Sequence, residues 1–319
     1  MTETDIGYEA LETGAAWRIV PRDVLLVAGP DALTYLQGQC SQDLTPLPVG
    51  GSTEALLLSP QGKVDAYVRI TRTGDDLFLL DTDAGCGPAA QARLERFRLR
   101  TKVTIEPAAW SCLSLRGPRA LDGATASGSG TDGPTLVLRV DWPGWSGVDL
   151  MGPTTGTDPD LAAWIPQGAV PCGVQAWESA RIEAGVPMGG REVTETTIAA
   201  EVGLVDRTVS FTKGCFTGQE LVARLDARGS NVVRRLCAVV VAGDAVPPIG
   251  AAVWTADGGH EVGALSSVAR SPGSEATVAL AALHRRVEPP EAVEVRWHGP
   301  DGDLVAIGEA RPLPLSTST

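Results

Sequence analysis

A ten-residue pattern occurs twice in this sequence and restricts how the chain can fold. VLLVAGPDAL occupies 24–33 and CLSLRGPRAL occupies 112–121, and the two share leucine, Gly-Pro and Ala-Leu at matching offsets. Each copy is typical of a strand that turns into a helix, with Pro30 or Pro118 at a first helical position, where its missing N–H costs nothing. The repeat predicts two αβ units built alike.

The residues that follow each copy support this prediction. After the first copy, 52–81 predicts three strands separated by turns, 89–99 has apolar residues at helical spacing, and 102–106 predicts another strand. After the second copy, 135–152 predicts a hairpin and 174–185 predicts a helix that ends on its final glycine. Both halves therefore combine strands with helices.

The pattern changes from about residue 232. Short alternating or β-branched runs, separated by Gly, Pro and Asp turns, indicate a small antiparallel barrel or sandwich. The predicted fold class is α+β, with a first αβ domain over 1–109 that need not be continuous. A second αβ domain follows over 110–230, and a β domain over 231–319. Within the second, 122–134 is small and polar, which predicts a flexible surface loop.

Composition excludes several classes of protein. Twenty-six basic and 39 acidic side chains give a formal charge of −13, so we expect no stable binding of nucleic acid. The first residues lack a basic segment followed by an apolar run, and no stretch has the roughly 18 apolar residues of a membrane span. We therefore expect a cytoplasmic protein without membrane contact.

Cysteine and histidine spacing argues against a resident metal. The six cysteines form no C-x-x-C pair, which disfavours a local zinc site or a ferredoxin-type cluster, and we expect reduced thiols. The three histidines also fit no metal motif. They are His260, His284 and His298.

The segment FTKGCFTGQELVARLDARG, at 211–229, is the most distinctive in the chain. Thr217 and Glu220 have the spacing of a capping box, which predicts a helix from Gly218 that stops at Gly229. Cys215 would then lie just before the positive end of the helix dipole and two residues from the ammonium group of a lysine. Both neighbours favour a thiolate.

Two interpretations of Cys215 stay open from the residues alone. Gly214 and Gly218 would allow another backbone or a flat ligand to approach closely, which favours an exposed and activated thiol. The alternative is an ordinary free cysteine in a turn. No histidine or second cysteine lies nearby in sequence, so a Cys-His nucleophile or a redox disulfide would need a distant partner.

A second polar segment is RIEAGVPMGG, at 181–190. Glu183 falls in the last turn of a predicted helix, where a negative charge opposes the dipole. A carboxylate in that position suggests a binding role. A solvated glutamate beside Arg181 or Arg191 is the alternative.

These segments resemble a known family. KGCFTGQE, at 213–220, is similar to the K-G-C-[aromatic]-x-G-Q-E signature of YgfZ-type folate-binding proteins, the bacterial relatives of a mitochondrial iron–sulfur assembly factor. YLQGQCSQDL at 35–44, SPQGKVDAYVRI at 59–70, RIEAGVPMGG and GALSSVARSP at 263–272 resemble other segments of that family in the same order. The resemblance covers nearly the whole chain.

The wider superfamily includes the aminomethyltransferase T-protein of glycine cleavage. The resemblance implies a three-domain cloverleaf, with two ferredoxin-like αβ domains and a C-terminal antiparallel β-barrel around a central folate channel. In T-proteins a G-G-I-x-D-D segment supplies an aspartate for transfer. The match here places Ala66 and Tyr67 on the paired aspartates, with Asp65 one residue away. Aminomethyltransferase activity is therefore not expected.

Other site residues follow from the resemblance. Glu183 matches the glutamate that binds the pterin edge, and Asp65 is a second candidate. Arg224 and Arg228 could attract the glutamate tail of folate, although surface pairs with Asp226 or Glu220 are the alternative.

The implied function is a tetrahydrofolate-binding accessory protein that assembles or repairs iron–sulfur clusters in client enzymes, including radical enzymes that modify tRNA. Cys215 and Lys213 would form the thiol motif, in transient contact with a cluster, and the implied partners are client or assembly proteins. The neighbouring residues that would position this loop are Gly214, Phe216, Gly218, Gln219 and Glu220. Two rivals stay open: a one-carbon transferase that uses Asp65 or Glu183 as its base, and a folate-binding scaffold with a structural Cys215.

Overall fold

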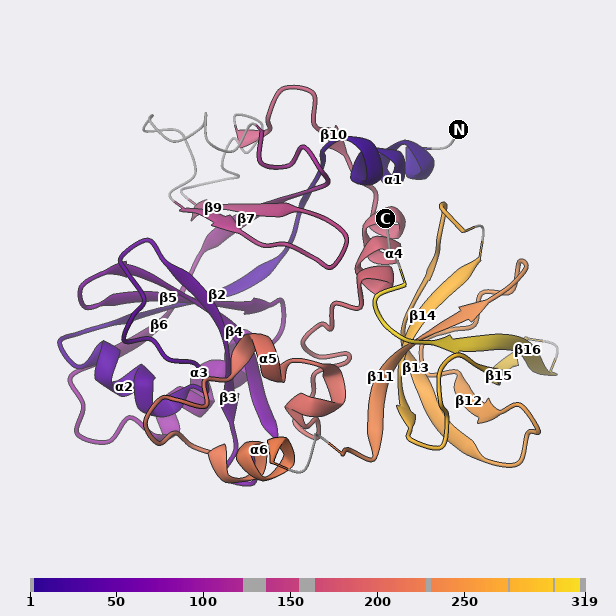
Figure 1. The fold of residues 1–319 in the computed structure, drawn as a ribbon. Helices are drawn as coiled ribbons and strands as arrows, with labels where there is room; N and C mark the ends of the chain where they lie inside the picture. Colours follow the sequence, from indigo (N-terminus) through magenta and orange to yellow (C-terminus); the bar gives the residue numbers. More distant parts are fainter. Residues whose placement is uncertain are drawn as a thin grey trace.

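The computed structural model describes residues 3–122, 136–154, 164–227, 231–274, 276–300 and 302–315. Two five-stranded sheets and a closed six-stranded barrel make up the fold, as Figure 1 shows. The predicted α+β class with a C-terminal barrel is confirmed. Residues 123–134 of the predicted loop, Arg228 and the predicted helix stop at Gly229 lie outside the described residues.

The first sheet is antiparallel throughout, in the order β3-β4-β5-β2-β6. Helices α2 and α3 cover one face, where Leu36 and Leu94 pack on Val27 and Ile70. The other face meets the second sheet, since Leu79 packs against Met151. The elements are β2 (Arg22–Ala28), α2 (Ala32–Gln39), β3 (Ser52–Leu58), β4 (Val64–Gly74), β5 (Leu77–Asp83), α3 (Gly87–Arg96) and β6 (Thr104–Ala108).

The second sheet has the order β10-β1-β7-β9-β8, with β1 and β10 parallel and the other neighbours antiparallel. Its strand β1 and helix α1 come from the start of the chain, within the 1–109 range expected for a first domain that need not be continuous. Local patterns identify a strand but not its partner, which only long-range pairing decides. The elements are α1 (Glu3–Thr13), β1 (Ala16–Ile19), β7 (Trp110–Arg116), β8 (Leu136–Arg139), β9 (Gly147–Pro153), β10 (Val170–Pro171) and α4 (Val174–Ala184).

The repeat marks equivalent turns rather than equivalent helices. Helix α2 begins at Ala32, so Pro30 lies in the turn before it, and 118–122 forms turns instead of the predicted second helix. The shared glycines adopt φ values of +137° at Gly29 and +122° at Gly117. A Cβ there would lie 2.1 Å and 2.5 Å, respectively, from the carbonyl oxygen of another segment. Each copy therefore lets a second backbone cross close to the strand end.

The barrel closes in the order β11-β14-β13-β12-β15-β16. Helix α4 ends at Gly185 in the left-handed conformation, as predicted, and its Ile182 packs on Val278 and Leu280 of the barrel. Among the described residues, no helix has the length and apolar character needed to cross a membrane. The barrel strands are β11 (Arg234–Val241), β12 (Ala252–Thr255), β13 (Glu261–Arg270), β14 (Thr277–His284), β15 (Glu291–Gly299) and β16 (Gly302–Arg311).

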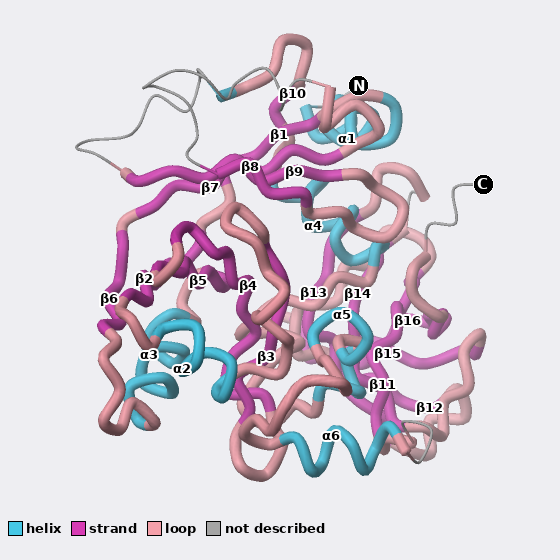
Figure 2. The backbone as a smooth tube through the Cα atoms, turned by 60° about the vertical axis from the view of Figure 1, so that its left-hand side comes forward, coloured by secondary structure: helices cyan, strands magenta, loops and turns pink. Residues whose placement is uncertain are grey.

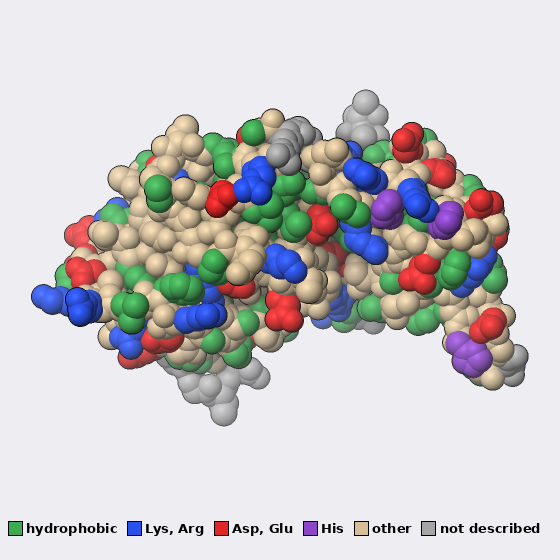
Figure 3. Space-filling model, turned by 90° about the horizontal axis from the view of Figure 1, so that it is seen from below, with side chains coloured by type: hydrophobic (Ala, Val, Ile, Leu, Met, Phe, Trp, Pro, Cys, Tyr) green, Lys and Arg blue, Asp and Glu red, His purple; other side chains and the backbone are tan. Residues whose placement is uncertain are grey.

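Short helices connect the second sheet to the barrel. They are η2 (Ala199–Val202), α5 (Val205–Thr208) and α6 (Gln219–Asp226). Figures 1 and 2 both place α6 at the lower end of the molecule, beside the hairpin that joins β3 to β4. Seen from below in Figure 3, acidic and basic side chains are interspersed over that face.

Candidate functional site

Three of the distinctive sequence segments meet at the lower end of the first sheet. Lys213 Nζ donates hydrogen bonds of 2.7, 2.8 and 2.8 Å to the carbonyl oxygens of Gln37, Cys40 and Gln42. These residues belong to the last turn of α2 and the segment just after it. An ammonium group has three N–H donors, so these contacts use them all. Desolvation lowers the pKa of Lys213. The lysine therefore clamps a turn, and the prediction that it activates the Cys215 thiol is not supported.

Replacing Lys213 with Met should lower the free energy of unfolding by about 1.5–3 kcal/mol, because three carbonyl groups lose a charged donor while the apolar stem is retained. Urea denaturation measures this change. Lys63, which is exposed, provides the control: Lys63→Met should change stability by less than about 0.5 kcal/mol. Equal stabilities for the two variants would show that the clamp contributes nothing.

Two glycines interlock the loop with the β3–β4 hairpin. Gly218 has φ +81°, and a Cβ there would lie 2.5 Å from the carbonyl oxygen of Ser59. Gly62 has φ +76°, and a Cβ there would lie 2.6 Å from Cβ of Leu221. The close backbone approach expected at Gly218 is therefore present, whereas a Cβ at Gly214 would meet only open space. Residues 59–62 and α6 are held in one arrangement.

The start of α6 differs from the predicted capping box. Gly218 is the N-cap residue, in the left-handed conformation, and no side chain caps the helix. A capping box needs an extended N-cap residue with a hydroxyl, which this glycine cannot supply. Instead, Gln219 Oε1 accepts a hydrogen bond of 3.1 Å from the backbone N–H of Phe216. Glu220 pairs with Arg224 on the surface, which was the alternative to a folate-binding role for that arginine.

Cys215 lies at the tip of this loop. It is the one exposed thiol among the six free cysteines, all of which are described. Its neighbour Phe216 packs against the cluster around Leu58 and Val222, and the Lys213 ammonium lies 5.2 Å from the centre of the Phe216 ring. The backbone on either side is anchored while the thiol faces solvent.

A central cavity of about 110 Å³ lies between the two sheets and residues 186–188. Buried charges surround it. Arg69 Nη1 lies 2.7 Å from Asp149 Oδ2, and Arg116 Nη1 lies 3.0 Å from Asp149 Oδ1. Arg69 also pairs with Asp81 at 2.9 Å, as does Arg22 at 2.8 Å. Burial alone would raise the pKa of Asp149, but the two arginines and a hydrogen bond from Ser114 lower it well below its usual range.

The carboxylates that line the central cavity are already paired. Asp83 pairs with Arg22 and also accepts the backbone N–H of Gly189 at 2.7 Å. Glu54 accepts the Tyr67 hydroxyl at 2.8 Å and a hydrogen bond from Arg207 at 2.5 Å. A pterin presents its amino and ring N–H groups to carboxylates, and here those acceptors are engaged. The central cavity therefore does not fit the pterin ring that the resemblance implies for it.

The carboxylate of Glu183 is also occupied by hydrogen bonds, away from the central cavity. The Tyr8 hydroxyl donates a 2.6 Å hydrogen bond to Glu183 Oε2, and Ser271 forms a further side-chain hydrogen bond. Trp177 and Arg181 of the same helix line the central cavity, whereas Glu183 does not. Two residues advance a helix by about 200°, so Glu183 and Arg181 face opposite sides. Its pterin-binding role stays a prediction.

Glu183 should make stability depend on pH. Desolvation raises its pKa above the ordinary value of 4.5, so the folded chain binds the proton more tightly than the unfolded chain. The stability of wild type relative to Glu183→Gln should therefore fall as pH rises from about 4.5 through the raised pKa. Urea denaturation of both proteins between pH 4 and 8 measures this. A difference that stays constant, or that grows with pH, would contradict the assigned environment.

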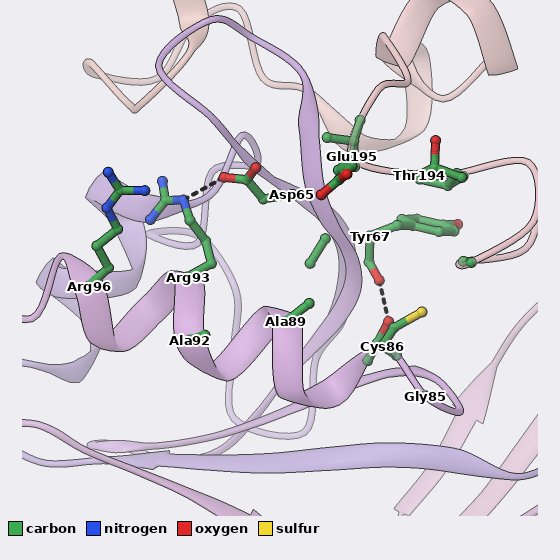
Figure 4. A pocket seen from close by; sticks show the side chains of 16 residues that line it. Asp65, Tyr67, Gly85, Cys86, Ala89, Ala92, Arg93, Arg96, Thr194 and Glu195 are labelled. Atoms are coloured by element: carbon green, nitrogen blue, oxygen red, sulfur yellow. Dashed lines mark hydrogen bonds and ion pairs between the residues drawn. The ribbon is translucent and has the colours of Figure 1, made fainter.

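A larger lateral cavity of about 480 Å³ lies between α3, the start of β4 and residues 189–195. Figure 4 shows the side chains that line it, with the Asp65 carboxyl directed toward Arg93. Ala66, the next residue along the strand, belongs to the core-facing row, as the alternation of side chains along a strand requires. Arg93 Nε donates to Asp65 Oδ2 at 3.0 Å. Tyr67 lines both cavities and separates them.

Most residues that line the two cavities were not predictable from local sequence patterns. Charged residues inside otherwise apolar strands, such as Arg69 and Asp81, were the one signal in the sequence for a buried ion-pair network. The strand that carries Asp149 gives no sign that this residue is their partner. Arg93 and Glu195 lie on segments that no local pattern connects. Among the described residues no group of histidine, cysteine and acidic side chains could hold a metal ion.

Comparisons with known proteins agree with the fold. Residues 23–132 match the GCVT N-terminal domain. The glycine cleavage aminomethyltransferase T structure from Bartonella henselae superposes with a TM-score of 0.81, covering 98% of this chain and 89% of that one at 20% identity. At that identity the likeness shows the fold alone, and it confirms the predicted cloverleaf.

Two curated relatives define the family. An aminomethyltransferase from Thermus thermophilus is 29% identical over 292 residues, covering 85% of this chain and 80% of the relative. The mitochondrial iron–sulfur cluster assembly factor IBA57 from Homo sapiens is 32% identical over 273 residues, covering 77% of this chain and 73% of the relative. The chain therefore belongs to the aminomethyltransferase (GCVT) superfamily and, within it, to the family that joins IBA57 with the YgfZ-type proteins.

Proposed function

We propose that this chain is a tetrahydrofolate-binding accessory protein for the assembly or repair of iron–sulfur clusters in client enzymes. The observation that carries the proposal is the exposed Cys215 at the tip of an anchored loop, in a relative of an iron–sulfur cluster assembly factor. The cluster is cargo in this role. A cluster normally needs four ligands, so one cysteine contacts it transiently while a client or assembly protein supplies the rest.

The loop suits such a contact for a physical reason. Lys213, Gly218 and Gly62 hold its backbone in one arrangement, so presenting the thiol to a partner costs little conformational entropy. The thiol is exposed, so it does not have to leave a packed environment to contact a partner. Folate binding and radical clients that modify tRNA enter the proposal through the family resemblance.

Aminomethyl transfer is the competing function, favoured by the similarity to aminomethyltransferases. Tyr67 occupies a position where the match expects an aspartate, and its hydroxyl is bonded to Glu54. Desolvation raises the pKa of Asp65, while Arg93 opposes this shift. The residues therefore favour the accessory role.

Deletion of the gene, followed by complementation, tests the proposal. Loss of the chain should lower the activities of several iron–sulfur enzymes, including one that modifies tRNA, and leave glycine cleavage unchanged. The purified chain should bind tetrahydrofolate without forming methylene-tetrahydrofolate from an aminomethyl donor. Stoichiometric methylene-tetrahydrofolate formation, with cluster enzymes unaffected by the deletion, would establish the transferase instead.

A further inference from the structure

We infer that a cationic patch at the lower end of the barrel docks an acidic segment of a protein partner, an inference that rests on the client or assembly protein proposed above. The patch consists of three arginines: Arg234 at the start of β11, and Arg285 and Arg286 in the turn after β14. All three are exposed. Figure 3 shows basic side chains gathered beside histidines on the barrel part of the lower face.

Strand pairing brings these arginines together. Arg234 lies opposite His284 in the β11–β14 pair, and the backbone N–H of Arg285 donates to the Val233 carbonyl at 2.9 Å. The pKa of His284 gives separate evidence. Desolvation lowers it, the charges of Arg286, Arg234 and Arg285 lower it further, and no carboxylate of the described residues opposes them. The three guanidinium groups therefore act on one place.

The patch lacks the carboxylates that neutralise most arginines of this chain. Within the described ranges most arginines form an ion pair with aspartate or glutamate, whereas Arg234, Arg285 and Arg286 form none. The chain carries 39 acidic and 26 basic side chains, so carboxylates are abundant. Composition alone therefore does not account for three clustered arginines without an acidic partner.

The turn that presents the arginines is held in place. His284 Nδ1 accepts the backbone N–H of Arg286 at 3.2 Å, and Val287, the next residue, packs in the barrel core. Val233, which is 54% exposed, adds an apolar side chain beside Arg234. Guanidinium groups donate to carboxylates in pairs, and arginine is enriched in protein interfaces. The patch therefore suits an acidic segment that also carries an apolar side chain.

The charge of the chain favours a protein over a nucleic acid as the partner. A phosphate backbone extends well beyond three arginines, and a chain with a formal charge of −13 repels the rest of it. A short acidic segment needs only the patch itself.

The patch lies at the same end of the molecule as the Cys215 loop. Helix α6, which follows that loop, ends at Asp226, and only a short connection separates it from Arg234 at the start of β11. Figure 1 shows both α6 and the start of β11 at the lower end. A partner held by the patch is therefore on the side of the molecule where the thiol is exposed.

Charge reversal tests the patch directly. Arg285→Glu/Arg286→Glu should weaken binding of a short fluorescein-labelled peptide of glutamate and valine by roughly tenfold or more, because two attractive charges become repulsive. Fluorescence anisotropy at low salt measures this binding. Arg285→Lys/Arg286→Lys keeps both charges and should bind the peptide much as wild type does.

The matched control is Arg100→Glu/Lys102→Glu. It changes the net charge by the same amount at two exposed positions whose side chains have no ion pair in the described part of the chain. It should bind the peptide like wild type. Thermal denaturation verifies that all three variants are folded.

Cells that carry each variant in place of wild type test the biological role. Activities of iron–sulfur enzymes should fall by roughly twofold or more with Arg285→Glu/Arg286→Glu, because the partner is no longer attracted. They should stay normal with Arg285→Lys/Arg286→Lys and with the matched control.

The outcomes separate this inference from the proposed function. Normal activities with Arg285→Glu/Arg286→Glu, in cells where Cys215→Ala lowers them, overturn the patch and leave the proposed function intact. Normal activities with both variants overturn both. A wild-type chain that fails to bind the peptide, or that binds a single-stranded RNA more tightly than the peptide, overturns the assignment of an acidic protein segment.

Discussion

Asp149→Ala should lower the free energy of unfolding by about 3–5 kcal/mol, because it leaves two buried arginines without their shared partner. Arg69 and Arg116 are 7% and 3% exposed, so water cannot replace the carboxylate. Ser114 loses a 2.7 Å hydrogen bond to the same oxygen that Arg116 contacts. Because β4 of the first sheet and β9 of the second meet through this ion pair, the loss should loosen the contact between the sheets.

Urea denaturation of the variant and of a surface control measures the effect. Arg119 and Asp122 form an ion pair whose side chains are 71% and 64% exposed, so Asp122→Ala should change stability by less than about 0.5 kcal/mol. Should Asp149→Ala fail to accumulate, Asp149→Asn keeps the size of the side chain and removes only its charge. A loss no larger than that of the control would contradict the role given to the network.

Local sequence patterns predicted those parts of the fold that local physics determines. Helix α3 follows from its apolar spacing, the end of α4 from Gly185, and the barrel from short strands between turns. The placement of β1 in the second sheet did not follow, because its pairing with β7 joins residues that are nearly a hundred positions apart, such as Ala16 and Arg116. Strand partners of that kind leave no mark on the strand itself.

The candidate site was predictable in part for the same reason. The sequence marked Cys215, Lys213 and Gly218 as unusual, and the structure joins them to the α2 turn and the β3–β4 hairpin. It did not reveal that Lys213 donates its N–H groups to three backbone carbonyl oxygens, because those carbonyls belong to residues 37–42, which are distant in sequence. Nor did it reveal that Glu183 faces Tyr8, because helix orientation depends on what α1 packs against.

Cys215→Ala should reduce the activities of several iron–sulfur enzymes in cells to near the level of the deletion strain, with the largest losses under oxidative stress. The physical reason is that no other cysteine can replace it. Cys40, Cys112, Cys172 and Cys237 are buried, and burial raises the pKa of each thiol. Cys86, which is half-buried in the lateral cavity, also has its pKa raised, first by desolvation and then by Asp83 and Asp23.

The contrast between Cys215→Ala and Cys86→Ala tests the central claim most directly. Both remove one sulfur atom from a thiol that is not fully buried, and equal amounts of folded protein can be verified by immunoblot and by thermal denaturation. Activities of iron–sulfur enzymes, measured in cells that carry each variant in place of the wild type, should collapse with Cys215→Ala and stay normal with Cys86→Ala. Normal activities with Cys215→Ala would contradict the account and leave the thiol a bystander.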